Sequence, residues 1–412
     1  MTAKISLSDY ISSVASKKLS RVEINKKVSN QHELNGVGAL KQIFGRDSDK
    51  QLSFDCTFMY LSDDEDDCFS RTGHITWYDS RANNPMRSEF RLYYSYEFDD
   101  VMAASGEGDD LHLIKKHDGS LITVVCKENT SVANQVRWLF KLSESGTAFT
   151  VQQISENGQI PYASQYVLGE LGITLEPPEG GDIEELLSEF QDGMPTTKVF
   201  SDYAREHTTD IDPIVEPDKA LMSWMEKEEY FYRAMEHHLI LEDLDKLSKE
   251  ISNNNPNTPE LYISGAMHYI QVRKSRAGNS FQNHIEALLK AHQIRYSVQK
   301  RTENGKIPDF IMPSIDLYWD DTFPTDRLTM LAAKRTCKER WAQILEEALR
   351  MKERHLITME PAITTNTIDA MCSKRIQLVI PESIRTTYKD NDLNRIWNVA
   401  TFLEYVKGKQ VV

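Results

Sequence analysis

The sequence contains few cysteines, and none of them are spaced to bind zinc. The five cysteines among 412 residues are scattered and never form a CxxC pair. An odd number of scattered thiols argues against a disulfide framework, and the absence of CxxC argues against a structural zinc site. We therefore expect ordinary thiols in a reducing compartment.

Long apolar runs are also missing. The first residues, MTAKISLSDYISSVASKKL, lack the apolar core of a signal peptide, and no later run approaches the ~20 apolar residues of a membrane span. We expect a soluble, cytoplasmic protein that makes no membrane contact. The length of 412 residues predicts two domains, because a single core of ordinary size does not grow this large.

The sequence also lacks a surplus of positive charge. The formal net charge is -15, which by itself disfavours a nucleic-acid partner. The acidic groups are concentrated, however, because residues 151–270 carry 24 Asp and Glu against 7 Lys and Arg, a net of -17. Residues 271–350 carry 14 basic and 10 acidic groups. The local field of this later segment is therefore compatible with a phosphate partner.

Residues 1–165 carry the pattern of a mostly β domain. Short runs such as LSFDCTFMYL, EFRLYYSYEF and SLITVVC are separated by Gly, Asp, Asn or Ser turns, which predicts a small barrel or sandwich. We expect two helices in this domain, at residues 7–19 and 132–142.

Three charged residues alternate along one predicted strand of this domain. Arg87, Glu89 and Arg91 are two residues apart, so they share one face and would present two guanidinium forks beside a carboxylate. Such a set suits the guanine and cytosine edges of a major groove. The alternative is a solvated hairpin held by a cross-strand ion pair, and the residues alone favour that alternative.

Residues 166–195 have the Pro/Gly punctuation and negative charge of a linker, so the second domain is expected at 196–412. Helices are predicted over 218–252 and 261–270, followed by a turn at RKSRAG and a further helix capped by Ser280. The runs IPDFIM, LTMLAAK, HLITM and RIQLVI predict strands, and a helix with Trp341 and Ile344 inward is expected after the second of these. Alternating strands and helices indicate an α/β sheet.

The ends of the first two strands carry the groups of a metal-dependent nuclease. Asp309 lies at a Pro-Asp step and Lys334 ends the next strand. In the common arrangement PD…(D/E)xK a second acid lies two residues before the Lys, where this sequence has Ala332. Glu347 could supply that carboxylate, and Glu286 could support it. In the alternative interpretation Asp309 caps a turn and Glu347 is solvated.

The blocks RKSRAGxS, PDFxxPS, LxMLAxKxTCK(D/E)RWxQIL and LVIPESI resemble the catalytic domain of the EcoRII-type restriction endonucleases, in order over residues 200–410. The resemblance implies an active site written PD…Kx12E, which falls on Asp309, Lys334 and Glu347, with an additional glutamate at Glu286. It implies that Asp309 and Glu347 bind Mg²⁺, and that the missing acid at Ala332 is a family trait.

The resemblance also implies DNA contacts in both halves of the chain. The N-terminal half is similar to the effector-DNA-binding pseudobarrel of this family, although Pro85 and Phe90 stand where the family has basic residues. The residues expected to read bases in the C-terminal half are Lys338, Glu339 and Arg340. A basic segment earlier in this half, expected to contact DNA, contains Arg273, Lys274 and Arg276. In the N-terminal half, the residues expected to clamp DNA are His32, Arg87, Glu89 and Arg91.

We therefore expect a multidomain α+β protein with an N-terminal β-rich DNA-binding pseudobarrel and a C-terminal α/β restriction-endonuclease-like PD-(D/E)xK domain. The resemblance implies a prokaryotic type II restriction endonuclease that cuts double-stranded DNA at a palindrome with a CC/GG core, acts as a homodimer, and is restrained by its N-terminal domain. The alternatives are a catalytically inactive DNA reader on a nuclease fold and a nicking or mismatch-repair nuclease.

Overall fold

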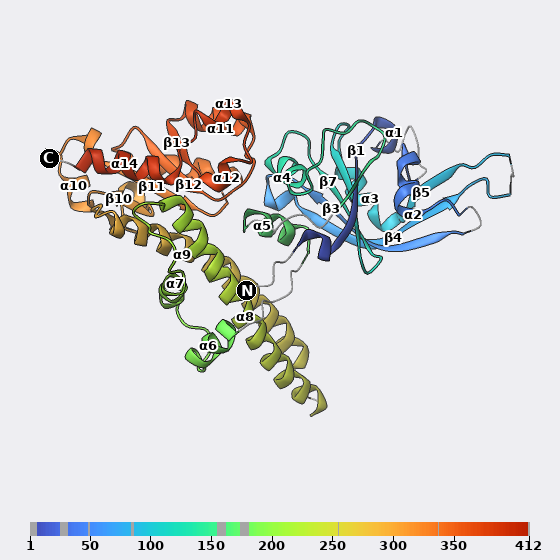
Figure 1. Cartoon of the computed structure of the whole chain (residues 1–412), viewed down its shortest axis with the longest axis horizontal. Coiled ribbons are helices and arrows are strands. Elements are labelled where there is room, and N and C mark those ends of the chain that lie inside the picture. The colour runs from blue at the N-terminus through green and yellow to red at the C-terminus, as the bar shows by residue number, and fades with distance from the viewer. Residues whose placement is uncertain are drawn as a thin grey trace. The chain divides into compact units, whose positions relative to one another are not determined.

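The computed structural model describes residues 6–24, 32–47, 50–83, 86–154, 162–173, 181–253, 255–336 and 338–410. The chain divides into two compact units (Figure 1). Within the described residues, the N-terminal unit comprises 6–173 with Ala362–Thr364, and the C-terminal unit comprises 181–361 and 365–410. Each unit contains its own sheet and helices, so the predicted multidomain α+β class is confirmed.

The N-terminal unit is built on an eight-stranded sheet of order β2-β5-β4-β3-β7-β6-β1-β8. Strands β3 and β7 run parallel, and the other neighbours are antiparallel. The strands are β1 (Ile11–Lys18), β2 (Glu33–Leu34), β3 (Leu52–Leu61), β4 (Phe69–Asp79), β5 (Phe90–Tyr94), β6 (Asp110–Lys116), β7 (Leu121–Cys126) and β8 (Thr150–Gln153).

Short helices accompany this sheet. They are α1 (Arg21–Ile24), α2 (Lys41–Phe44), α3 (Asp99–Ala104), α4 (Ser131–Leu139) and α5 (Tyr162–Glu170), with 3-10 turns at Leu7–Asp9, Val37–Leu40, Glu65–Asp67 and Tyr96–Phe98. The core forms around Phe58, Trp77, Leu92 and Phe98, which are almost fully buried.

The predicted helix at residues 7–19 is wrong, because most of this segment is strand β1. Strand β1 pairs with β6 on one edge and β8 on the other, so its backbone groups are satisfied by two neighbours. Ile11, Val14 and Ala15 are fully buried. A strand buried on both faces lacks the alternation that identifies half-buried strands in a sequence.

The C-terminal unit contains a five-stranded sheet of order β13-β12-β11-β10-β9. Strands β11, β12 and β13 are parallel, while β9, β10 and β11 are antiparallel neighbours. The strands are β9 (Ser297–Val298), β10 (Phe310–Met312), β11 (Thr329–Lys334), β12 (Arg354–Thr358) and β13 (Ile376–Val379). This mixed sheet places the end of β11 beside the start of β10.

Two long helices form a hairpin that projects from the rest of this unit (Figure 1). They are α8 (Pro217–Ser252) and α9 (Thr258–Ala291). The remaining helices are α6 (Gly181–Glu189), α7 (Thr197–Glu206), α10 (Ile315–Trp319), α11 (Thr365–Ser373), α12 (Glu382–Arg385), α13 (Asp390–Leu393) and α14 (Val399–Gln410), with 3-10 segments at Glu303–Gly305, Thr325–Arg327 and Lys338–Glu346. No described helix is both long enough and apolar enough to cross a membrane.

Three expectations for this unit need correction. The RKSRAG segment is not a turn, because α9 runs through it without interruption. Ser280 is accordingly a buried mid-helix residue rather than a cap. The segment around Trp341 is a 3-10 helix instead of an α-helix. Helix α9 packs along α8, and Arg273 of α9 forms an ion pair with the buried Glu236 of α8. This contact stabilises the helical conformation of the RKSRAG segment.

Candidate active site

Asp309 and Lys334 are brought together by the pairing of β10 with β11. Phe310, the residue after Asp309, lies opposite Leu331. Oδ2 of Asp309 accepts a hydrogen bond of 2.8 Å from the backbone N–H of Ala333 and one of 3.3 Å from Nζ of Lys334. The Lys334 side chain is 37% exposed and that of Asp309 is 15% exposed. A fixed carboxylate therefore lies beside an ammonium group that still reaches solvent.

Glu347 supplies a second carboxylate, and it is partly buried. Its Oε2 atom is buried and has no hydrogen-bond partner among the described residues. Burial raises the pKa of Glu347 to about 7; the positive charge of Lys334 opposes this rise, and the negative charge of Asp309 adds to it. The three predicted residues thus lie within one electrostatic neighbourhood.

The turn that carries Glu347 is held by a polar cluster that the sequence did not reveal. Glu303 Oε2 accepts a hydrogen bond from the backbone N–H of Leu349 at 3.3 Å, and both oxygens of Glu303 lie 2.6 Å from the hydroxyl of Tyr318. Nε of Arg354 donates to the backbone carbonyl of Glu347 at 3.0 Å. Glu303 lies in a short ENG turn with no recognisable motif, so no sequence signal pointed to it.

Glu286 does not join these three residues through any contact that is described. It lies on α9, where its carboxylate accepts a hydrogen bond from Tyr296 at 3.0 Å and pairs with Lys290 at 2.8 Å. Burial acts to raise the pKa of Glu286, but these two partners hold it below its usual value. The side chain instead faces a pocket of about 300 Å³ between α7 and α9, also lined by Lys198 and Arg205.

The carboxylates of this site are candidate ligands for a divalent cation. Within the described ranges no group of three or more His, Cys, Asp or Glu side chains is close enough to form a complete metal cage. Asp309 and Glu347 nevertheless offer carboxylate oxygens, and the buried Oε2 of Glu347 has no hydrogen-bond partner in the described part of the chain. Mg²⁺ is commonly bound by one or two carboxylates, with water and substrate phosphate completing its shell. The residues therefore fit Mg²⁺, while Ala332 is fully buried and offers no ligand.

The basic segment of α9 makes contacts within the protein. Nε of Arg273 donates to both oxygens of Glu236, at 2.7 and 2.9 Å. Arg276 donates to the backbone carbonyl of Pro195 at 2.7 Å, and its guanidinium lies over the rings of Phe200 and Tyr232. Both arginines thus have structural partners. The side chains of Lys274, Lys338, Glu339 and Arg340 lie outside the described residues.

The proposed N-terminal clamp residues are joined by ion pairs. Arg91 pairs with Glu33 at 3.0 Å and with Glu89 at 3.1 Å, and Glu89 also pairs with Arg81. The hydrogen bonds from Arg81 and then Arg91 lower the pKa of Glu89. The ion-paired hairpin of the alternative interpretation is therefore present.

The other two clamp residues differ in their surroundings. His32 has a left-handed φ of 37°, and its Nε2 lies 3.1 Å from Asp99. Arg87 is exposed and has no ion-pair partner among the described residues. Pro85 lies outside the described residues, and Phe90 is buried in the core.

The second half of the chain matches a known protein family. Residues 232–403, which contain Asp309, Lys334 and Glu347, match the family model described as EcoRII C terminal. The C-terminal unit is similar to the EcoRII C-terminal family over these residues. The resemblance predicted from the sequence is thereby confirmed for this unit.

Two curated relatives extend the comparison. The chain is 31% identical over 216 residues to the type II restriction enzyme EcoRII of Escherichia coli, covering 52% of this chain and 51% of that protein. It is 28% identical over 168 residues to the type II restriction enzyme SsoII of Shigella sonnei, covering 34% and 54%. The chain thus spans about half the length of the curated relatives it matches.

Two solved structures that are similar to this chain are complexes with DNA. Metal-depleted Ecl18kI in complex with uncleaved DNA aligns with a TM-score of 0.45 at 20% identity, over 57% of this chain and 85% of that one. The complex of restriction endonuclease PspGI with substrate DNA aligns with a TM-score of 0.36 at 17% identity, over 55% and 90%.

Proposed function

We propose that this protein is a type II restriction endonuclease that hydrolyses double-stranded DNA at a short palindrome with a CC/GG core. The observation that carries the proposal is the grouping of Asp309, Lys334 and Glu347 within an EcoRII-type domain. Among the described residues, Oε2 of Glu347 has no hydrogen-bond partner. A lysine near two carboxylates is a set of groups suited to metal-assisted phosphodiester hydrolysis.

Asp309 and Glu347 would hold Mg²⁺ in this site. When bound, Mg²⁺ polarises the phosphate and makes a bound water more acidic. The Ala333 N–H and Lys334 fix one oxygen of Asp309, so this carboxylate is oriented before DNA arrives. Because Lys334 is still partly exposed, its ammonium group is available to orient the attacking water or a phosphate oxygen. The family resemblance assigns Glu286 a supporting role from α9, although its described contacts are with Tyr296 and Lys290.

The N-terminal region is assigned a regulatory role in this proposal. Residues 1–165 would form the effector-DNA-binding domain, 166–195 the acidic linker and 196–412 the catalytic domain. The effector domain would bind a second copy of the target with His32, Arg87, Glu89 and Arg91, and it would restrain cleavage until DNA is bound. Lys338, Glu339 and Arg340 would read G·C pairs. A palindromic target requires two catalytic domains, so we propose a homodimer in a prokaryotic cytoplasm.

The decisive experiment is to sequence the ends of plasmid DNA incubated with the purified protein, with and without Mg²⁺, beside Asp309→Ala. The expected result is Mg²⁺-dependent double-strand ends at one short palindrome, absent from the variant. DNA binding without cleavage in both proteins would instead identify a catalytically inactive reader on a nuclease fold. Single-strand ends alone would favour a nicking or mismatch-repair enzyme.

A further inference from the structure

The pocket of about 300 Å³ in the C-terminal unit lies between α7 and α9, which pack against each other (Figure 1). Each helix contributes side chains at helical spacing, so the lining comes from one side of each helix. The polar lining residues are Lys198, Asp202 and Arg205 on α7 and Asn283, Glu286 and Lys290 on α9. A pocket with so many charged groups suits a charged ligand.

The two carboxylates of the pocket already have cationic partners. Nη2 of Arg205 donates to Oδ1 of Asp202, and Nζ of Lys290 lies 2.8 Å from Glu286. Lys198 is exposed and forms no ion pair with any described residue. Three cations and two carboxylates leave the pocket with one uncompensated positive charge. The charge of the pocket therefore favours an anion.

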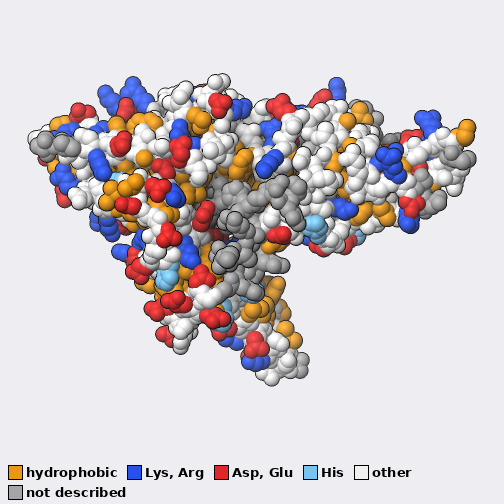
Figure 2. Space-filling view, in the orientation of Figure 1, with side chains coloured by type: hydrophobic (Ala, Val, Ile, Leu, Met, Phe, Trp, Pro, Cys, Tyr) orange, Lys and Arg blue, Asp and Glu red, His pale blue; other side chains and the backbone are white. Residues whose placement is uncertain are grey.

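These cations are unusual in their part of the chain. Residues 151–270 contain 24 Asp and Glu but 7 Lys and Arg, and acidic side chains gather around α6 on the face shown in Figure 2. Lys198 and Arg205 are two of those seven basic residues. They are seven positions apart, so they lie on the same side of α7. The pocket is thus a local basic site within an acidic segment.

Arg205 is held in place by buried residues behind the pocket. Its Nη1 lies 2.9 Å from Nδ1 of the fully buried His284. Because a guanidinium can only donate, Nδ1 accepts and the ring proton lies on Nε2, which is 2.8 Å from Oε2 of the buried Glu228. The guanidinium also lies 5.9 Å from the ring centre of Trp224. An arginine oriented in this way loses little freedom when its fork binds a ligand.

The pocket is connected to the candidate active site through Tyr296, which directly precedes β9. The hydroxyl of Tyr296 donates to Glu286 in the pocket lining at 3.0 Å. Its ring packs edge-on against Phe310, the residue after Asp309, with 6.1 Å between the ring centres. One pair of aromatic rings therefore lies between the pocket and the start of β10. A polymer that is bound at the candidate active site can reach the pocket.

Among anions, a phosphate group suits this lining best. The planar fork of an arginine matches two phosphate oxygens, and a lysine adds a mobile point charge. The volume is at the lower end of the ~300–1,000 Å³ of ligand pockets, which favours one small group over a large cofactor. The lining contains no aromatic residue on which a nucleobase could stack. The ligand is therefore the phosphate itself rather than a base.

We propose that this pocket binds a backbone phosphate of the DNA that occupies the candidate active site. Lys198 and Arg205 are its two donors, and His284 positions Arg205. The choice of DNA over free phosphate rests on the proposed function, since a nuclease brings a chain of phosphodiesters to the adjacent carboxylates. Such a contact orients the duplex without reading its sequence.

The test measures DNA binding by full-length wild type, by the pocket variant Lys198→Gln with Arg205→Gln, and by the matched control Lys246→Gln with Lys249→Gln. The control removes the same charge from two exposed lysines of α8. Fluorescence anisotropy of a labelled duplex with a CC/GG palindrome, without Mg²⁺, gives the affinity at several salt concentrations. One neutralised phosphate contributes ~0.9 to the slope of log affinity against log salt. We expect the pocket variant to lose about 0.9 of this slope and about 10-fold in affinity near ~0.1 M salt, and the control to match wild type.

An unchanged slope would overturn the proposal, and a loss of about 1.8 would indicate two separate phosphates instead of one shared pocket. Calorimetric titration with inorganic phosphate distinguishes the source of the anion. Phosphate binding that is lost in the pocket variant, together with an unchanged DNA slope, would identify a free-anion site and refute the DNA contact. Circular dichroism monitors folding. If the pocket variant unfolds, the exposed Lys198→Glu takes its place and must weaken DNA binding at least ~10-fold, whereas Lys246→Glu must not.

Cleavage of plasmid DNA by wild type is measured in parallel with Mg²⁺, so that failure of this inference is separate from failure of the nuclease proposal. A wild type that cuts DNA, with a salt slope that the pocket substitutions leave unchanged, refutes the phosphate pocket alone. A wild type whose salt slope depends on the pocket but which never cuts DNA refutes the nuclease and leaves the phosphate site in place.

Discussion

Nζ of Lys334 and Oδ2 of Asp309 lie 3.3 Å apart, and the same oxygen also accepts the Ala333 N–H. One carboxylate oxygen is thus occupied by two donors from β11. The other oxygen, Oδ1, makes neither of these contacts. The carboxylate is therefore oriented by the sheet even before a cation or DNA arrives.

We predict that Lys334→Met and Asp309→Asn both lower the cleavage rate by at least ~100-fold, because each removes a group from the reacting centre. They should differ in metal binding. Asp309→Asn removes a proposed ligand and should abolish Mg²⁺ binding in titration calorimetry, whereas Lys334→Met should retain it. Loss of Mg²⁺ binding in the lysine variant would contradict this division of roles. Lys300→Met, an exposed lysine before β10, is the control.

Glu303 is predicted to be a positioning residue for Glu347. Glu303→Gln weakens the charge-assisted hydrogen bonds from Leu349 and Tyr318, so the turn should loosen. We expect Mg²⁺ affinity to fall ~10–100-fold, as is common when residues that orient metal ligands are changed. Tyr318→Phe should show the same direction with a smaller loss. The exposed Asp320→Asn is the control, and unchanged affinity in the Glu303 variant would refute the role.

The raised pKa of Glu347 predicts a pH-dependent stability. Its folded-state pKa of about 7 lies above the ordinary value of 4.5, so between these values the folded protein binds more protons than the unfolded chain. This group therefore makes the free energy of unfolding fall as pH rises from about 4.5 to 7. After a discount for solvent screening, Glu347→Gln should stabilise the metal-free protein at pH 8 by on the order of 1–2 kcal/mol.

Urea denaturation at pH 5 and pH 8 in a chelator measures this effect. Wild type and Glu347→Gln should have similar stability at pH 5 and diverge at pH 8. The wild type should also lose Mg²⁺ affinity below pH 7, because protons then compete for the carboxylate. Equal stability of the two proteins at both pH values would show that the carboxyl of Glu347 is solvated.

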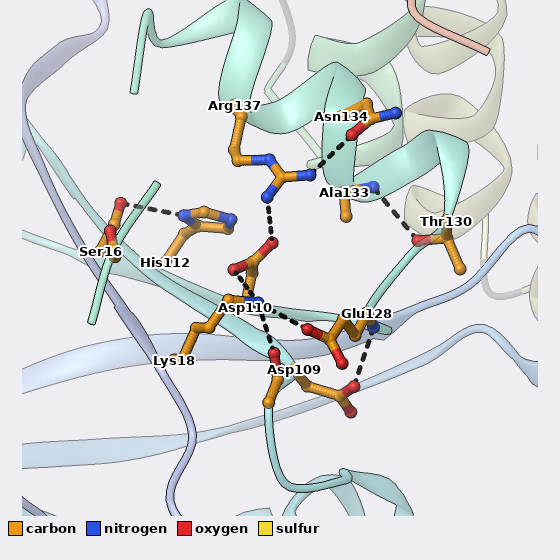
Figure 3. Close-up of polar contacts among 12 residues, drawn as sticks. Ser16, Lys18, Asp109, Asp110, His112, Glu128, Thr130, Ala133, Asn134 and Arg137 are labelled. Carbon is orange, nitrogen blue, oxygen red and sulfur yellow. Dashed lines mark hydrogen bonds and ion pairs between the residues drawn. The ribbon is translucent and has the colours of Figure 1, made fainter. Parts of the chain in front are cut away.

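The buried His112 is expected to make the stability of the N-terminal unit sensitive to acid. It lies on β6, where its Nδ1 is 3.0 Å from the hydroxyl of Ser16, near Arg137 and Lys18, both of which pair with Asp110 (Figure 3). Burial, and then the charges of Arg137 and Lys18, lower the pKa of His112 to about 3. The unfolded chain therefore binds a proton that the folded unit does not, and stability falls as pH drops below about 6.5.

The expected slope from this one group is up to about 1.4 kcal/mol per pH unit between pH 6 and pH 4. His112→Gln cannot titrate, so its urea-denaturation midpoint should depend less on pH in this window. His117→Gln is the control, since His117 also belongs to the N-terminal unit but is exposed. Parallel pH profiles for wild type and His112→Gln would mean that other groups determine the acid response.

Sequence reasoning identified residues that the structure brings together, but it assigned parts of the local secondary structure wrongly. Lys334 was identifiable because it ends an apolar run, and Asp309 because it lies at a Pro-Asp step. The structure places Asp309 at the start of β10 rather than at the end of a strand, and antiparallel pairing brings this start beside the end of β11. The helix of α9 was divided wrongly because RKSRAG contains turn-forming residues, whereas Arg273 is held by Glu236 from a distant part of the chain. Local propensity cannot register such a tertiary contact. The support of Glu347 by Glu303 was missed for the same reason.

Substitutions of Arg87 and Arg91 distinguish DNA contact from structural support in the N-terminal unit. Arg91 is held by Glu33 and Glu89, while Arg87 is exposed and has no ion-pair partner in the described part of the chain. If Arg87 contacts a phosphate, Arg87→Ala should weaken binding of target DNA and reduce the slope of log affinity against log salt by about 1, without changing stability. Arg91→Ala should instead lower the melting temperature, because it leaves Glu33 without this partner. Fluorescence anisotropy at several salt concentrations, with thermal denaturation, distinguishes them; an unchanged salt slope for Arg87→Ala would remove this residue from the DNA interface.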